Sequence, residues 1–343
     1  MDRGLVFVLG TQRSGTTWLA NIFDSHPECL HFYEPFAPAY GIFPYFPDEF
    51  VLPVAPAPDL ALRLRADLPR LVELRSRLFD PVHATRRQFE REAWLMEKLE
   101  IVGRRLQVPA LRFAARFNLV HLNRIGQDPV AWFEKGEIRL TAIKEVRLYF
   151  KATFLAGVFP EAKFVHVVRH PAAVVLSMDN FLRRGRLVEI RDHIPRFVDT
   201  IRNQEALERY QPVLARVRNG SLHDRLAAYW RVANEELARQ LEAMPARAYP
   251  IVYENLATDP LARVAEMLEW CGLGMHPQTD AYVRRSSTSK SDRKTALDTN
   301  RVSATYYRDW VGKVTPEIVH AVERVCGDSP LMAHFAPFYE GME

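Results

Sequence analysis

The chain has 343 residues, of which 48% are hydrophobic, and its 46 Lys and Arg residues against 42 Asp and Glu residues give a formal net charge of +4. This length permits a substantial core in one large domain or in two ordinary ones. The net charge is too small to indicate nucleic-acid binding, and no apolar run of the roughly 18 residues that a membrane span needs occurs.

The cysteine content argues against a disulfide-stabilised or zinc-binding protein. Cys29, Cys271 and Cys326 lie far apart and form no C-x-x-C pair. The N-terminal residues MDRG lead at once into a five-residue apolar run, which is too short for the apolar region of a signal peptide. We therefore expect a cytoplasmic protein.

The first predicted elements are a strand, a loop and a helix in direct succession. The apolar run LVFVL at Leu5–Leu9 predicts the strand, and GTQRSGTT follows it at 10–17. A helix is predicted over Thr16–Ser25, because its apolar residues share one face until the break at His26-Pro27. A second short strand, CLHF, is predicted at 29–32.

The loop GTQRSGTT has the Gly-x4-Gly spacing of a phosphate-binding loop, formed by Gly10 and Gly15. Glycines let backbone N–H groups turn inward, and the N-terminus of the next helix adds partial positive charge. Thr16 stands where a Walker loop has lysine, so the loop either binds no nucleotide or binds one other than ATP. The candidate ligand-binding residues are Arg13, Ser14, Gly15, Thr16, Thr17 and Trp18.

The next segment interrupts the strand pattern. Residues 35–58 are rich in proline and aromatic residues and predict an ordered loop over a pocket mouth, with a plain surface excursion as the alternative. Residues 60–133 are mostly helical in pattern, so we expect one domain, 1–343, with an acceptor-covering insertion at about 40–130. The loop rings that could stack on an acceptor are Tyr40, Phe43, Tyr45 and Phe46.

Further strands are predicted at Leu140–Ile143, Lys163–Val168 and Tyr249–Tyr253, with helical patterns between several of them. This alternation indicates an α/β fold with a mostly parallel central sheet. Ligands bind such sheets beyond the carboxyl ends of the strands, where Arg169 follows a strand and Ser177 lies on the next helix. Arg169 is placed to bind a second anionic group; a structural arginine at the strand end is the alternative.

Together, the segments TQRSGTTWL and VVRHPAAVVLS resemble the 5′-phosphosulfate loop and the 3′-phosphate motif of sulfotransferases that use 3′-phosphoadenosine 5′-phosphosulfate (PAPS). IKEVRLY, the YEDL-like IVYENLATDPLARVAEMLEWCGL, and STSKSDRKT…NRV…WVGKVTPE match in order. The resemblance spans about three quarters of the chain, leaves residues 40–130 poorly matched, and is nearest the carbohydrate and tyrosylprotein branches. It implies a P-loop-like three-layer fold with helices flanking the sheet.

The resemblance also implies roles for the candidate residues. Transfer of the sulfuryl group would be in-line, through a loose transition state, with Arg13 neutralising the leaving phosphate and no metal expected. Ser14 to Thr17 would hold the 5′-phosphate, while Arg169 and Ser177 would hold the 3′-phosphate. Arg301 is the favoured contact from the late basic loop. His170 departs from the Asp or Asn usual after the motif arginine, and we expect little effect on binding from it, since the position lies in the turn.

A hydroxyl acceptor needs a base near the sulfur. Glu34, in HFYEPF, lies 21 residues after Arg13 and matches the glutamate that follows the second strand in the carbohydrate and tyrosylprotein enzymes. The alternatives are that Glu34 is a surface carboxylate or a salt-bridge partner for a loop arginine, or that His31 is the base. Lys144 and Arg147 either line the site or begin a solvated helix.

The sequence is therefore identified as a member of the PAPS-dependent sulfotransferases, acting on a carbohydrate, a glycolipid or another small molecule and not on nucleic acid. Two other classes stay open. A P-loop kinase or NTPase is disfavoured by the missing lysine and the lack of a clear Walker B carboxylate. An inactive nucleotide-binding module of the same fold is the second.

Overall fold

The computed structural model describes residues 3–36, 46, 59–66, 68–69, 133, 135–184, 188–288 and 302–339. Its centre is a sheet of five parallel strands in the order β2-β3-β1-β4-β5. The strands are β1 (Gly4–Leu9), β2 (Cys29–Tyr33), β3 (Leu140–Glu145), β4 (Lys163–Val168) and β5 (Ala248–Val252). Because all five are parallel, their carboxyl ends lie at one edge, as the predicted α/β fold requires.

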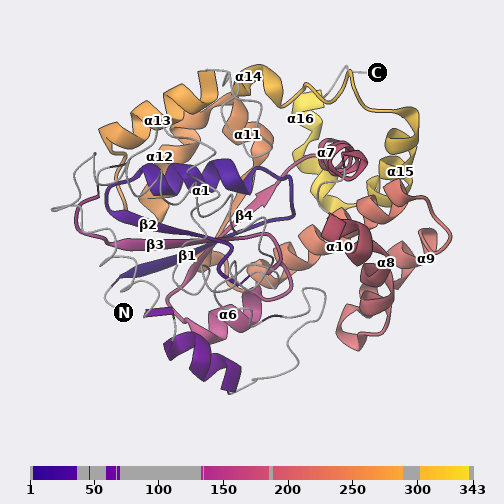
Figure 1. Ribbon diagram of the computed structural model, residues 1–343, viewed down its shortest axis with the longest axis horizontal. Coiled ribbons are helices and arrows are strands. Elements are labelled where there is room, and N and C mark those ends of the chain that lie inside the picture. Colours follow the sequence, from indigo (N-terminus) through magenta and orange to yellow (C-terminus); the bar gives the residue numbers. More distant parts are fainter. Residues whose placement is uncertain are drawn as a thin grey trace, which may run out of the picture.

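Helices cover both faces of this sheet (Figure 1). The α-helices are α1 (Thr16–Ser25), α6 (Ala152–Val158), α7 (Pro171–Arg183), α8 (Val188–Arg202), α9 (Gln211–Arg216), α10 (Leu222–Glu242), α11 (Tyr253–Thr258), α12 (Pro260–Trp270), α13 (Pro277–Thr288), α14 (Ser303–Tyr306), α15 (Pro316–Cys326) and α16 (Ala336–Tyr339). In the described ranges the 3-10 helices are η2 (Glu205–Tyr210), η3 (Pro245–Arg247) and η4 (Pro330–His334). Within the described ranges, no helix is both long and apolar enough to cross a bilayer.

The alternation of side chains along β1 divides the core into two layers. Val6 and Val8 pack on one face with residues of α1, α12 and α13. Leu5, Phe7 and Leu9 pack on the other face with residues of α6, α7, α10 and α15. Successive strand residues point to opposite faces, so a strand that is apolar throughout must be buried on both sides. The predicted three-layer architecture is confirmed.

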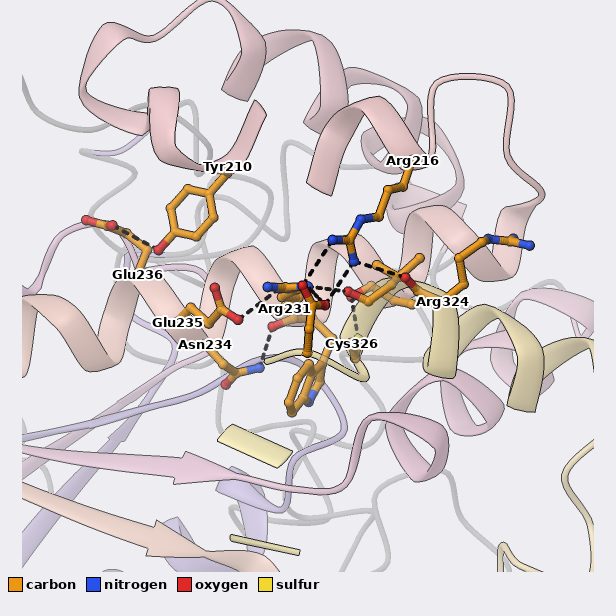
Figure 2. Close-up of polar contacts among 12 residues, drawn as sticks. Tyr210, Arg216, Arg231, Asn234, Glu235, Glu236, Arg324 and Cys326 are labelled. Atoms are coloured by element: carbon orange, nitrogen blue, oxygen red, sulfur yellow. Dashed lines mark hydrogen bonds and ion pairs between the residues drawn. The ribbon is translucent and has the colours of Figure 1, made fainter. Parts of the chain in front are cut away.

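Hydrogen bonds and ion pairs of charged side chains connect α15 and the residues after it to the long helix α10 (Figure 2). The buried guanidinium of Arg231 donates to the carbonyl of Val325, at 2.7 Å, and to the carboxylate of Asp328, at 2.5 Å. Arg324 pairs with Asp224, the residue that closes the capping box at the start of α10. These contacts hold the C-terminal elements against the helices that follow β4.

The strand boundaries follow the predictions to within two residues: β1 and β5 begin one residue earlier than predicted, β2 ends one residue later, and the ends of β3 and β5 also differ. β3 continues past the predicted Ile143 to Glu145, because its neighbour β1 pairs with it as far as Leu9. Tyr253 was expected to end the last strand, but it begins α11, since β4 ends at Val168 and offers no partner beyond Val252.

Most of the predicted insertion at 40–130 lies outside the described residues, as do Tyr40, Phe43 and Tyr45. Phe46 is described and is 5% exposed, with its ring packed edge-on against Phe36 and Phe154. Phe46 is therefore a core residue and does not offer an exposed ring to an acceptor.

Candidate active site

The loop between β1 and α1 has a backbone that requires both of its glycines. A side chain at Gly10 would stand 2.5 Å from the carbonyl oxygen of Val167 in β4. Gly15 has a φ of +99°, and a side chain there would collide with the ring of Tyr253. Arg13 also has a positive φ, of 70°. Ser14 closes the turn by donating its hydroxyl to the carbonyl of Thr11, at 2.7 Å.

This loop presents an N-terminus suited to an anion. Gly15 caps α1 without any side-chain hydrogen bond, so the partial positive charge of the helix end faces the loop. Thr11 is fully buried, and its hydroxyl has no hydrogen-bond partner within the described part of the chain. Thr16 is buried and Thr17 half-buried, while Trp18 donates its indole N–H to Ser286, at 3.0 Å. Trp18 therefore fixes the helix against α13.

The two predicted motifs meet in the structure. The Nε of Arg13 donates to the hydroxyl of Ser177, at 2.9 Å, although the two residues are 164 positions apart. The guanidinium of Arg13 lies 4.2 Å from the ring centroid of Phe181, one helical turn after Ser177. Arg169 donates to the carbonyl oxygen of Arg13, at 3.4 Å. Both cations therefore lie where β1 and β4 end, side by side in the sheet.

Arg169 is held between aromatic rings. Its guanidinium lies 4.4 Å from the centroid of Tyr253 and 5.8 Å from that of Tyr306, and its carbonyl accepts the indole N–H of Trp230, at 2.9 Å. Arg169 is 9% exposed, and its Nε has no partner within the described ranges. A buried guanidinium with an unused donor is costly unless an anion binds it, which suits a ligand-binding position.

His170 has a larger structural role than the sequence indicated. Its Nδ1 accepts the N–H of Ala172, at 3.2 Å, and so caps α7 as an Asp or Asn would. Its ring is stacked on Trp310, with 4.6 Å between centroids. Burial, and secondarily the charge of Arg169, lowers the pKa of His170 to about 3, so the ring is neutral. The expectation that His170 has little effect on binding stays a prediction, while its capping and packing contacts give it a structural role.

Glu34 lies buried at the end of β2, with a φ of 46°. Lys144, on the neighbouring strand β3, donates its ammonium group to the Glu34 carboxylate, and both side chains are almost fully buried. The Glu34 N–H also donates to the Lys144 carbonyl, at 2.8 Å. Glu34 is thus not a surface carboxylate, and it forms an ion pair with Lys144 of β3. Lys144 and Arg147 are both buried, so the solvated alternative for them is wrong.

A second carboxyl group, missed by the sequence reasoning, lies beside this ion pair. Glu145 accepts the N–H of Phe36 at 2.7 Å, and its other carboxyl oxygen has no partner in the described part of the protein. Burial, together with the nearby charge of Glu34, raises the pKa of Glu145 to about 8. The sequence feature that could have pointed to Glu145 is its position in IKEVR, directly after Lys144.

His31, the rival base, is fully buried inside β2 and stands opposite Ala142 of β3. Arg301 lies outside the described residues, together with the basic loop before it. Within the described ranges, no group of three or more His, Cys, Asp or Glu side chains could hold a metal ion. A groove of about 400 Å³ lies between α10, α9, η2 and η4, and none of its lining residues is a predicted site residue.

Comparisons with known proteins agree with these motifs. The model of the sulfotransferase family matches residues 6–191. Carbohydrate sulfotransferase 5 of Mus musculus is 23% identical over 357 residues, covering 100% of this chain and 83% of the mouse protein.

Among solved structures, the sulfotransferase domain of the Synechococcus PCC 7002 olefin synthase has 15% identity and a TM-score of 0.44, covering 96% of this chain and 98% of that domain. Mouse sulfotransferase SULT7A1 complexed with PAP has 10% identity and a TM-score of 0.42, covering 98% of this chain and 89% of that one. Because the family model spans more than half of its length, the chain belongs to the sulfotransferase family, the enzymes that transfer a sulfuryl group to an acceptor.

Proposed function

We propose that this sulfotransferase moves the sulfuryl group of PAPS to a hydroxyl group of a carbohydrate, a glycolipid or another small molecule. The observation that carries the proposal is the junction of Arg13, Ser177 and Arg169 at the carboxyl ends of β1 and β4. PAPS has two separate anionic groups, and this junction offers two cations from two motifs. An ATP-type P-loop would need only the first motif and its lysine.

In this proposal the 5′-phosphosulfate lies on the loop from Gly10 to Thr17, against the uncapped N-terminus of α1. Arg169 binds the 3′-phosphate with the donors that its protein contacts leave unused, and Ser177 assists it. Arg169 suits this role because its planar fork can bind a phosphate through two donors.

The protein's proposed contribution to catalysis is mainly electrostatic stabilisation of the transition state. In-line transfer builds negative charge on the oxygen that bridges sulfur and phosphorus, and a fixed cation there stabilises the transition state. Arg13 is the cation on the loop itself, and Ser177 and Phe181 orient its guanidinium. We propose that no metal ion takes part.

Glu34 is the proposed base that accepts the proton of the attacking hydroxyl. Its buried carboxylate is compensated by Lys144, and its place after β2 puts it at the same sheet edge as Arg13. Replacing Glu34 by Gln should lower kcat at least a hundredfold and leave nucleotide affinity unchanged. Equal activity of the variant and the wild type would return the role of base to His31.

A carbohydrate acceptor is favoured because the mouse relative is a carbohydrate sulfotransferase. We also propose a cytoplasmic location; the three cysteines are free in the structure, and two of them are buried. Transfer from sulfur-labelled PAPS to a panel of sugars, glycolipids and phenols would identify the acceptor class. Label on phenols alone would contradict the preference for a carbohydrate.

Calorimetric titration with 3′,5′-adenosine bisphosphate, the expected product, tests the donor site. Arg169→Ala should weaken binding at least tenfold, because it removes a charged hydrogen-bonding partner of the 3′-phosphate. Arg263→Ala is the matched control, since Arg263 is an exposed arginine that pairs with Glu266 on α12. Equal affinity of Arg169→Ala and the control would overturn the donor assignment.

A further inference from the structure

The peptide group between Arg169 and His170 is fixed at both its carbonyl and its N–H by buried side chains from distant elements. Trp230 of α10 donates to the Arg169 carbonyl, at 2.9 Å. The next N–H along the chain, that of His170, donates to the carboxylate of Glu254, at 3.1 Å. Glu254 is 0% exposed and lies in the first turn of α11. The backbone of Arg169 therefore depends on Glu254 directly.

The same carboxylate oxygen of Glu254 is bound by the C-terminal segment, which we define as residues 302–339. The hydroxyl of Tyr339 donates to Glu254 at 3.1 Å, and the indole N–H of Trp310 donates to that hydroxyl, also at 3.1 Å. Glu254 thus joins the Arg169 turn to the last described helix, α16.

Ring contacts reinforce this connection. The neutral ring of His170 contacts Trp310, Tyr339 and Phe335 of the C-terminal segment, with centroid distances of 4.6, 4.8 and 5.2 Å. Such aromatic pairs contribute stability beyond the burial of their area. The histidine that replaces the family's usual residue is therefore the docking point for the segment.

Glu254 is also linked to the phosphate loop through its neighbour. The ring of Tyr253 lies over the Arg169 guanidinium and against Gly15, so α11 begins where both motifs meet. Removing a hydrogen-bond donor from a buried carboxylate costs more than the bond itself, because the charge must then be accommodated without it. A change at Tyr339 should accordingly reach Arg169 through Glu254.

We propose that Glu254 and Tyr339 are positioning residues for Arg169, and that through them the C-terminal segment sets the preference of the donor site for a 3′-phosphate. This inference rests on the proposed function, because it assumes that Arg169 binds that phosphate. In this proposal neither Glu254 nor Tyr339 contacts the nucleotide. Their effect is confined to the ligand group that Arg169 meets.

The test compares two nucleotides that differ only in that group: 3′,5′-adenosine bisphosphate and adenosine 5′-monophosphate. Tyr339→Phe keeps the ring and removes the hydroxyl. The matched control is Tyr210→Phe, which removes a hydroxyl bound to buried Glu236, at 3.3 Å, in the remote contact drawn in Figure 2. Kd values for both nucleotides are measured by calorimetry on the wild type and the two variants.

Tyr339→Phe should raise the Kd of the bisphosphate about fivefold and leave that of the monophosphate unchanged. The ratio of the monophosphate Kd to the bisphosphate Kd, which measures the preference for a 3′-phosphate, should therefore fall. Tyr210→Phe should leave the ratio at its wild-type value. Glu254→Gln should lower the ratio further, and Tyr339→Phe decides alone if that variant does not fold. Equal loss of affinity for both nucleotides, or an unchanged ratio, overturns the inference.

The wild-type Kd values distinguish failure of the proposed donor site from failure of the proposed positioning role. If it binds the bisphosphate no tighter than the monophosphate, the proposed donor site fails and this inference fails with it. If it prefers the bisphosphate and Tyr339→Phe retains the full preference, only the positioning role fails.

Discussion

Glu34, Lys144 and Glu145 bring two carboxyl groups and one ammonium group to the ends of β2 and β3. Burial of Glu145, together with the charge of Glu34, outweighs the nearby positive charges of Lys144 and Arg147 and favours the protonated form of Glu145. Lys144 bonds Glu34, and the raised pKa of Glu145, about 8, identifies Glu145 as the protonated group. The charge state of this cluster can be measured through stability.

The sign of that effect follows from the shift. An unfolded Glu145 ionises near its ordinary pKa of 4.5, whereas the folded protein keeps its proton up to about pH 8. Unfolding between these values releases a proton, so Glu145 makes the free energy of unfolding fall as the pH rises from 4.5 to 8.

Glu145→Gln should remove this part of the pH dependence. The difference in unfolding free energy between the variant and the wild type should therefore shift in favour of the variant from pH 5 to pH 8. Urea unfolding at both pH values measures it. Glu266→Gln, a change to an exposed carboxylate on α12, provides the control. A pH slope in Glu145→Gln as steep as that of the wild type would contradict the assignment.

At the scale of elements, the β1–loop–α1 unit depends on glycine for its shape. Ala at Gly15 must adopt a φ of +99° against the ring of Tyr253, which either shifts the loop or displaces the ring from Arg169. We expect Gly15→Ala to lose about 1–2 kcal/mol of unfolding free energy and to weaken bisphosphate binding. Gly274→Ala adds a methyl group that meets nothing within 4 Å and should change neither quantity. Wild-type binding and stability in Gly15→Ala would show that the loop tolerates a side chain.

The elements themselves were largely readable from the sequence. Helix Thr16–Ser25 and strand Lys163–Val168 were predicted with their observed ends, because buried apolar runs between breakers leave little choice. β3 was predicted too short because Lys144 and Glu145 look like residues of a loop. Only the pairing with β1 shows that the strand continues through them.

The site residues that belong to a local motif could be predicted from the sequence. Arg13, Arg169 and Ser177 followed from local patterns at strand ends, and the structure brings them together. Glu254 and Tyr339 were not readable, because their contacts join residues 84 and 85 positions apart. No periodicity or spacing in the chain encodes such a pairing.

At the scale of the molecule, the order β2-β3-β1-β4-β5 explains why one edge of the sheet gathers the chemistry. β1 is central, so its loop lies between the β4 turn with Arg169 and the ends of β2 and β3 with Glu34 and Lys144. α7 and the C-terminal elements lie together beyond that edge in Figure 1. The proposed donor site thus draws on both the N-terminal loop and the C-terminal segment.

The most direct test of the central claim is calorimetric titration of the wild-type protein with 3′,5′-adenosine bisphosphate and, separately, with Mg²⁺-ATP. We expect tight binding of the bisphosphate and weak binding of Mg²⁺-ATP, because ATP lacks the 3′-phosphate that we assign to Arg169 and the loop has no Walker lysine. Tighter binding of Mg²⁺-ATP would contradict a PAPS site and favour a P-loop kinase or NTPase.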